Sequence, residues 1–149
     1  MYRVIVIYAS MSGNTELMAK IIAESVIENG LQVEVKDCWE VLPEELLKYD
    51  GILLGTYTWG EGALPDEFLD LYEELDGLDF TTKKGAVFGS GSSMYPYFAR
   101  AVDLLTEKLQ KCGAEMILPP LKIELSPTEK EQSLCREFGK QFSEKVIKL

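Results

Sequence analysis

The sequence predicts an α/β protein built on a doubly wound parallel sheet of five strands, with helices on both faces. Short apolar segments alternate along the chain with longer segments in which apolar residues recur every three or four positions. The first of the short segments, residues 2–8, is rich in β-branched residues, which is typical of a strand buried on both faces. Parallel strands joined by helices favour right-handed crossovers, and these place helices on both sides of the sheet.

The expected strands are the short segments that lie between the expected helices. The expected strands span residues 2–8, 33–36, 51–55 and 85–89, and a divided fifth strand spans 116–118 and 121–123.

The expected helices are identified by their start and stop signals. The first runs from about Thr15 to Asn29, before Gly30, and another begins at Pro65. A third ends at Cys112-Gly113, and the last begins at a capping box over residues 126–129 with proline at its first position. The side chains expected to face the core are Leu17, Ile21, Ile22, Ser25 and Val26; Phe68, Leu69, Leu71, Tyr72 and Leu75; and Leu134, Phe138, Phe142 and Val146.

Length and composition predict a single domain over residues 1–149, since 149 residues with 46% hydrophobic side chains suit one globular core. The sequence has no long apolar run and no leader-like segment, so we expect a cytoplasmic protein without a membrane partner. The three cysteines are widely spaced and form no CxxC pair, which favours buried thiols over a disulfide or metal site. With no histidine, acyl-transfer chemistry is disfavoured.

The negative charge of the chain is concentrated in one region. Residues 40–79 carry 12 acidic side chains against one basic side chain, Lys48, whereas the other 13 acids and 14 bases nearly balance. Such a region disfavours binding to nucleic acid or an anionic membrane and favours a basic protein partner. The alternative is a solvated acidic face that serves solubility.

Three loops follow expected strands and therefore lie at the same edge of the sheet, near the point where strand order reverses. The first, residues 9–16, brings hydroxyl and amide groups to a helix N-terminus, where the helix dipole favours a phosphate. It lacks the Lys-Ser/Thr pair of a triphosphate-binding loop, so a phosphate monoester fits better. The other two loops carry aromatic residues, Trp59 and Tyr95, which could sandwich a planar heterocycle. Together the loops point to flavin mononucleotide (FMN).

These three loops resemble those of the flavodoxins, and the resemblance covers nearly the whole chain. Residues 10–16 (SMSGNTE) resemble the phosphate loop of the family, residues 58–60 (TWG) its inner flavin loop, and residues 90–98 with Ala101-Val102-Asp103 its outer loop and following helix. The resemblance implies the strand order 2-1-3-4-5, with the cofactor between the first and third strands. Because the fifth strand has no long insertion, the chain resembles the short-chain type.

The resemblance also implies a set of cofactor-binding residues. Those expected at the phosphate are Ser10, Met11 through its backbone, Ser12, Gly13, Asn14 and Thr15, helped by Thr56, Tyr57 or Thr58. Those expected at the flavin ring are Trp59 on the inner face, Tyr95 on the outer face, Gly60, Ser90, Gly91, Ser92, Tyr97 and Phe98. Relatives often carry acidic residues in place of Ser92 and Pro96, so the resemblance leaves the redox poise open.

By this resemblance the protein is expected to be a monomeric, low-potential one-electron carrier that binds FMN non-covalently and has no catalytic or metal site of its own. It would pass electrons from a basic partner such as a flavodoxin/ferredoxin-NADP reductase to electron-accepting enzymes. The alternative is a flavodoxin-like flavoenzyme, such as a quinone reductase or an activator of ribonucleotide reductase. A receiver domain or a small tyrosine phosphatase is poorly supported, because the loops lack the required Asp and Cys residues.

Overall fold

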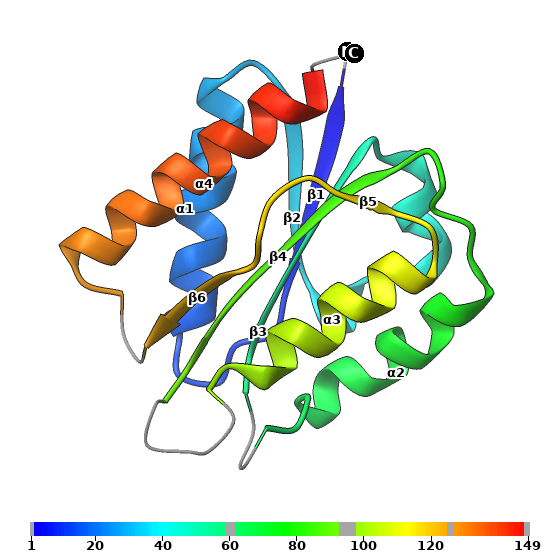
Figure 1. Ribbon diagram of the computed structural model, residues 1–149, viewed down its shortest axis with the longest axis horizontal. Helices are drawn as coiled ribbons and strands as arrows, with labels where there is room; N and C mark the ends of the chain where they lie inside the picture. Colours follow the sequence, from blue (N-terminus) through cyan, green and yellow to red (C-terminus); the bar gives the residue numbers. More distant parts are fainter. Residues whose placement is uncertain (1, 59–61, 93–97, 125–126, 148–149) are drawn as a thin grey trace.

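The computed structural model describes residues 2–58, 62–92, 98–124 and 127–147. Within these residues the strands form one parallel sheet in the order β2-β1-β3-β4-β5, and β6 also pairs with β4 (Figure 1). The strands are β1 (Arg3–Tyr8), β2 (Gln32–Asp37), β3 (Gly51–Tyr57), β4 (Lys84–Gly91), β5 (Glu115–Met116) and β6 (Leu121–Glu124). The predicted order and the doubly wound arrangement are confirmed.

The fifth strand is divided, as its sequence predicts. Glu115 and Met116 of β5 pair with the beginning of β4, whereas residues 121–124 of β6 pair with the end of the same strand. Both pairings are parallel, so β5 and β6 together occupy one position at the edge of the sheet. The segment between them holds Pro119 and Pro120, neither of which has an N–H group to offer to β4.

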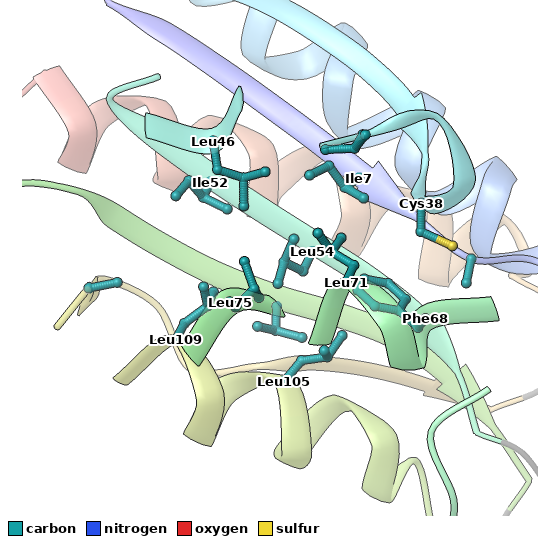
Figure 2. Packing of buried hydrophobic residues seen from close by; sticks show 14 of the residues in the cluster. Ile7, Cys38, Leu46, Ile52, Leu54, Phe68, Leu71, Leu75, Leu105 and Leu109 are labelled. Atoms are coloured by element: carbon teal, nitrogen blue, oxygen red, sulfur yellow. The ribbon is translucent and has the colours of Figure 1, made fainter. Parts of the chain in front are cut away.

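Helices cover both faces of the sheet (Figure 1). Helices α1 (Asn14–Glu28) and α4 (Glu129–Ile147) pack side by side on one face, over a core that includes Val6, Leu53 and Phe88. Helices α2 (Asp66–Glu74) and α3 (Arg100–Lys111) cover the other face. Figure 2 shows the core on that side, where side chains from the strands meet those of both helices; it includes Ile7, Ile52, Leu54, Phe68, Leu71, Leu75, Leu105 and Leu109.

The connection between β2 and β3 differs from the longer helices that follow the other strands. It consists of two short 3-10 helices, η1 (Cys38–Glu40) and η2 (Pro43–Lys48). Leu46 of η2 is fully buried against the same core as Phe68, so this connection covers the sheet with a few side chains rather than with a long helix. A further 3-10 turn, η3 (Leu75–Gly77), ends α2.

The last helix begins two residues later than predicted. Pro127 precedes the helix, and Thr128 takes the capping position instead. The Thr128 N–H donates to Glu131 Oε1 at 3.2 Å, and the Thr128 hydroxyl contacts the same carboxylate. The carboxylate of a capping box is therefore Glu131, three residues after Thr128. The proposed cap at Ser126 lies outside the described residues.

The prediction that a side chain faces the core is wrong for three residues. Leu17, Leu69 and Leu134 are each more than one third exposed. Two neighbouring side chains outside the predicted set are buried instead, Met18 in α1 and Cys135 in α4, whereas Phe68 next to Leu69 is buried as predicted. The remaining buried positions follow the expected helical stripes, and all three cysteines are buried free thiols, as predicted.

Candidate functional site

The carboxyl ends of β1, β3 and β4 bring three loops to one edge of the sheet, as the parallel topology requires. The first loop, residues 9–13, leads from β1 into α1. The other two follow Tyr57 and Gly91. Of the predicted cofactor-binding residues, Trp59, Gly60, Tyr95 and Tyr97 lie outside the described residues.

The first loop forms a tight turn against the start of α1. Gly13 is the capping residue, with φ of 90°. Its N–H donates to Ser10 Oγ at 3.0 Å, while its carbonyl oxygen accepts from the Leu17 N–H, also at 3.0 Å. Gly13 has no side chain that could cap the first turn of α1. The first amides of α1 are therefore left for an anion, where the helix dipole also favours negative charge.

The Thr15 side chain has a role that the sequence pattern does not reveal. Its hydroxyl lies 3.1 Å from the Ser90 hydroxyl, and both residues are buried. This pair connects the first turn of α1, which follows the first loop, to the end of β4, where the third loop begins. The side chains of Thr15 and Ser90 therefore hold the start of α1 and the end of β4 together.

The three residues at the end of β3 are placed differently from one another. Thr56 is fully buried, and its hydroxyl donates to the Tyr57 carbonyl oxygen at 2.8 Å. Tyr57 and Thr58 are half-buried and face the space between the loops. The Thr58 hydroxyl accepts from the Ala101 N–H at 3.2 Å, which fixes the second loop to the start of α3.

The third loop returns to β4 through a close backbone approach. A Cβ atom on Gly91 would lie 2.9 Å from the Ala99 backbone nitrogen, so a larger residue would push the two segments apart. Ala99 itself has φ of 50°, which is uncommon for a residue with a side chain. Phe98, at the end of this loop, packs partly buried against the core on the α2–α3 side.

These loops enclose a cavity of about 200 Å³. Side chains and backbone from all three loops line it: Met11, Ser12, Asn14, Tyr57, Thr58, Ser90, Gly91 and Ser92. The lining of the cavity combines the uncapped N-terminus of α1, several hydroxyl groups and an aromatic residue, Tyr57. A phosphate monoester attached to a flat ring system fits this donor set.

Burial and nearby carboxylates raise the pKa values of two tyrosines at the site. The Tyr8 hydroxyl donates to Glu16 Oε2 at 3.1 Å beside the phosphate loop, and burial together with this carboxylate raises the pKa of Tyr8 to about 12. Burial and a hydrogen bond to Glu67 likewise raise the pKa of Tyr57. Both phenols therefore stay neutral at physiological pH and can act as hydrogen-bond donors.

A doubly wound sheet with an uncapped helix N-terminus and two further loops at its switch point defines a mononucleotide-binding protein. The family model for flavodoxin matches residues 6–139. The chain is 42% identical over 146 residues to probable flavodoxin 2 of Bacillus subtilis, covering 97% of each chain. It is 41% identical over 149 residues to the flavodoxin of Maridesulfovibrio salexigens, covering 98% of this chain and all of that one.

Solved structures agree with these sequence matches. The crystal structure of oxidised flavodoxin 1 from Bacillus cereus superposes with a TM-score of 0.93 at 48% identity, covering 95% of this chain and 97% of the other. The chain belongs to the flavodoxin family. Flavodoxins bind FMN and transfer electrons, so this protein is an FMN-binding electron carrier and not an enzyme in its own right. It therefore interacts with redox partners. None of the described helices is long and apolar enough to cross a membrane.

Proposed function

We propose that the protein holds the phosphate of FMN in the loop over residues 10–15 and the flavin ring between the second and third loops. The Ser10, Ser12 and Asn14 side chains and the first amides of α1 would bind the phosphate. Tyr57, Thr58, Gly91 and Ser92 would border the ring, with Trp59 and Tyr95 on its two faces and Gly60, Tyr97 and Phe98 nearby. FMN supplies the redox chemistry, and the protein binds it, orients it and excludes water from it.

The observation that carries this proposal is the cavity lined by both the uncapped N-terminus of α1 and Tyr57. The Thr15–Ser90 hydrogen bond and the Thr58–Ala101 hydrogen bond support it, because they brace the three loops around that cavity. Binding through backbone amides and hydroxyls needs no lysine or arginine, and residues 4–19 contain none.

We further propose that the carrier accepts electrons from a basic reductase of the flavodoxin/ferredoxin-NADP type and passes them singly to acceptor enzymes. The acidity of residues 40–79 supports a basic partner on both sides of the exchange. Residues 1–149 would act as one FMN-binding domain. The three free, buried thiols are typical of a reducing compartment and support a cytoplasmic location.

Comparing FMN with riboflavin tests the phosphate assignment, since riboflavin lacks the phosphate. We expect Ser12→Ala to weaken FMN binding about tenfold, as the loss of a hydrogen bond to a charged group would. Binding of riboflavin should be unchanged. The dissociation constants are measured by flavin fluorescence quenching, and Ser133→Ala on exposed α4 is the control. Equal weakening of both flavins would contradict the assignment.

The carrier assignment is tested by anaerobic reduction of the reconstituted protein, followed by visible absorption. Uptake of electrons in two separated one-electron steps supports the shuttle. Reduction in a single two-electron step, together with steady oxidation of NAD(P)H by the isolated protein, would favour the flavoenzyme alternative.

A further inference from the structure

We propose that redox partners dock on an apolar surface beside the FMN cavity, and that the partner presents an apolar side chain surrounded by lysine or arginine. We call this the Trp39 surface; it consists of Met11, Trp39 and Leu42, bordered by Asp66, Glu67, Asp70 and Glu74. The proposal rests on the proposed function, and it names the place and the chemistry of the partner contact.

The three apolar residues of the Trp39 surface are unusually exposed. Trp39 is 67% exposed, Met11 66% and Leu42 65%, and no other large apolar side chain among the described residues exceeds 55%. Large exposed apolar groups that lie together mark interaction sites on proteins. Tryptophan in particular contributes strongly to binding when a partner buries it.

Trp39 stands on a rigid base rather than on a loose loop. The backbone N–H of Trp39 donates to Asp37 Oδ1 at 3.0 Å, which fixes the turn at the start of η1. The thiol of the preceding Cys38 donates to the Glu67 carbonyl oxygen at 3.3 Å and so connects η1 to α2. A partner would therefore meet Trp39 on a backbone that is already held in place, and less conformational entropy is lost when such a segment is bound.

Hollows lie on both sides of Trp39. One, of about 170 Å³, lies between η1, η2 and α2 and is bordered by Leu42, Asp70 and Glu74. The other, of about 240 Å³, lies between Trp39, Met11, Tyr57 and Asp66. Both are bordered by Trp39 and Glu67, so a partner side chain on either side would contact the indole ring and lie near a carboxylate.

The carboxylates around Trp39 lack cationic partners within the described part of the chain. Asp66, Glu67, Asp70 and Glu74 take part in none of its ion pairs. The Glu67 carboxylate makes a hydrogen bond with Tyr57, but its buried Oε1 atom has no hydrogen-bond partner among those residues. By contrast, Glu45 and Asp76, also in the acidic region, are paired with Lys36 and Lys108. The charge at the Trp39 surface is therefore available to a basic partner.

The Trp39 surface adjoins the cofactor site directly. Met11 and Tyr57 border both the hollow beside Trp39 and the cavity assigned to FMN. A partner seated on Trp39 would therefore have its contact region next to the cofactor. Another hollow, of about 390 Å³, lies at the opposite end of β1 and is bordered by Arg3 and exposed Ile27. This makes Ile27 a control for apolar exposure alone.

Affinity measurements on the FMN-loaded protein test the proposal with two basic probes, a ferredoxin/flavodoxin-NADP reductase and cytochrome c. We expect Trp39→Ala to weaken binding of at least one probe about tenfold, and Ile27→Ala to change neither more than about twofold. The paired substitution Asp70→Asn with Glu74→Gln should slow association at about 10 mM salt and flatten its salt dependence. Glu24→Gln with Glu144→Gln, an equal charge change on exposed α1 and α4, should do so less.

The outcomes separate this proposal from the proposed function. If Trp39→Ala and Ile27→Ala behave alike with both probes, or if the wild type binds neither probe, the docking proposal is overturned. Ferricyanide is too small to need a docking surface, so oxidation of the reduced protein by ferricyanide measures electron release alone. We expect this rate to be the same in Trp39→Ala and the wild type. A wild type that fails to bind FMN or to reduce ferricyanide overturns the proposed function instead.

Discussion

Gly13 and Gly30 have the same backbone conformation but lie in different places. Their φ angles are 90° and 94°, and a Cβ atom on either would meet nothing within 4 Å. We expect Gly13→Ala and Gly30→Ala to lower the free energy of unfolding of the apoprotein by a similar amount, about 1–2 kcal/mol, because both force a side chain into the left-handed region. Urea unfolding measures this effect.

Only Gly13 lies in the phosphate loop, so the two variants should separate in FMN binding. Relief of backbone strain at Gly13 would turn the neighbouring amides away from the phosphate, and we expect the dissociation constant of FMN to rise in Gly13→Ala alone. Gly30→Ala controls for the loss of stability. If both variants bind FMN as tightly as the wild type, the turn at Gly13 does not set the geometry of the loop.

Asp76 gives the stability of the protein part of its pH dependence. The buried Lys108 ammonium contacts the Asp76 carboxylate and lies 4.2 Å from the centre of the Tyr72 ring. The hydrogen bond from Lys108 holds the pKa of Asp76 below its ordinary value. A carboxyl whose pKa is lowered by folding stabilises the protein above its unfolded pKa, about 4, and loses that contribution as pH falls through the folded pKa.

We therefore expect Asp76→Asn to be less stable than the wild type at neutral pH, and the two stability curves to converge as the wild-type carboxyl becomes protonated below about pH 4. Urea midpoints measured across this range provide the test. Glu24→Gln, which removes an exposed carboxylate of α1 that forms no ion pair among the described residues, is the control for the loss of one charge. Curves for Asp76→Asn and the wild type that stay parallel down to low pH would show that the contact with Lys108 has no effect on the pH dependence.

At the scale of elements, the Thr15–Ser90 hydrogen bond couples α1 to β4. Thr15→Val keeps the shape of the side chain but leaves the buried Ser90 hydroxyl without this partner, which costs about 1–3 kcal/mol. Ser90→Ala removes the other partner. We expect the double variant to lose less stability than the sum of the two single variants, with a coupling energy of about 1 kcal/mol by urea unfolding. Strict additivity would mean that the two hydroxyls do not stabilise each other.

Helices α1 and α4 pack closely because α4 has a glycine at their contact. A Cβ atom on Gly139 would lie 2.7 Å from the Ile22 carbonyl oxygen and 2.8 Å from Ser25 Cβ. The Ser25 hydroxyl also donates to the Arg136 carbonyl oxygen at 2.6 Å, which holds the helices at this spacing. Gly139→Ala should therefore lower the thermal midpoint, since overpacking costs about 1–3 kcal/mol while the gain in helix propensity is about 1 kcal/mol.

A higher thermal midpoint for Gly139→Ala would show that the two helices can move apart at little cost. Gln141→Ala, on the exposed side of the same helix, is the control and should change stability by less than about 0.5 kcal/mol.

Elements were predictable from the sequence where one physical signal dominates. Strands buried on both faces have continuous apolar runs, so β1, β3 and β4 could be located within two or three residues. The segment over residues 38–48 has no such signal, because its two 3-10 helices are too short for a helical period. Leu17 and Leu134 were expected to face the core, yet tertiary packing buries their neighbours Met18 and Cys135 instead.

At the candidate site, too, local signals could be predicted from the sequence and long-range contacts could not. The hydroxyl-rich loop after β1 could be predicted from its residue types and from its place before a helix. That the Thr15 side chain contacts Ser90, 75 residues away, could not, since nothing local distinguishes a phosphate-binding hydroxyl from one that braces two loops. The Trp39 surface was also not predictable, because exposure of an isolated apolar residue depends on the elements packed around it.

For the whole molecule, the uneven charge determines how stability responds to salt. The formal net charge is −10, and residues 40–79 carry most of the excess acid. Asp70 and Glu74 lie four residues apart on α2, where like charges repel each other. Salt screens such repulsion. We therefore expect the thermal midpoint of the apoprotein to rise between about 10 mM and 0.15 M NaCl, each 1 kcal/mol corresponding to about 2–4 °C.

The salt response of the thermal midpoint should depend on where along the chain a negative charge is removed. Asp70→Asn with Glu74→Gln should raise the midpoint at low salt and reduce its further rise, because it relieves repulsion within the acidic region. Glu24→Gln with Glu144→Gln changes the net charge equally on the other face of the sheet, where bases balance acids, and should have a smaller effect. If the two pairs respond alike, net charge alone governs the salt response. A larger effect of the Asp70 and Glu74 pair would instead show that the acids around Trp39 repel one another. A basic partner would relieve that repulsion when it docks.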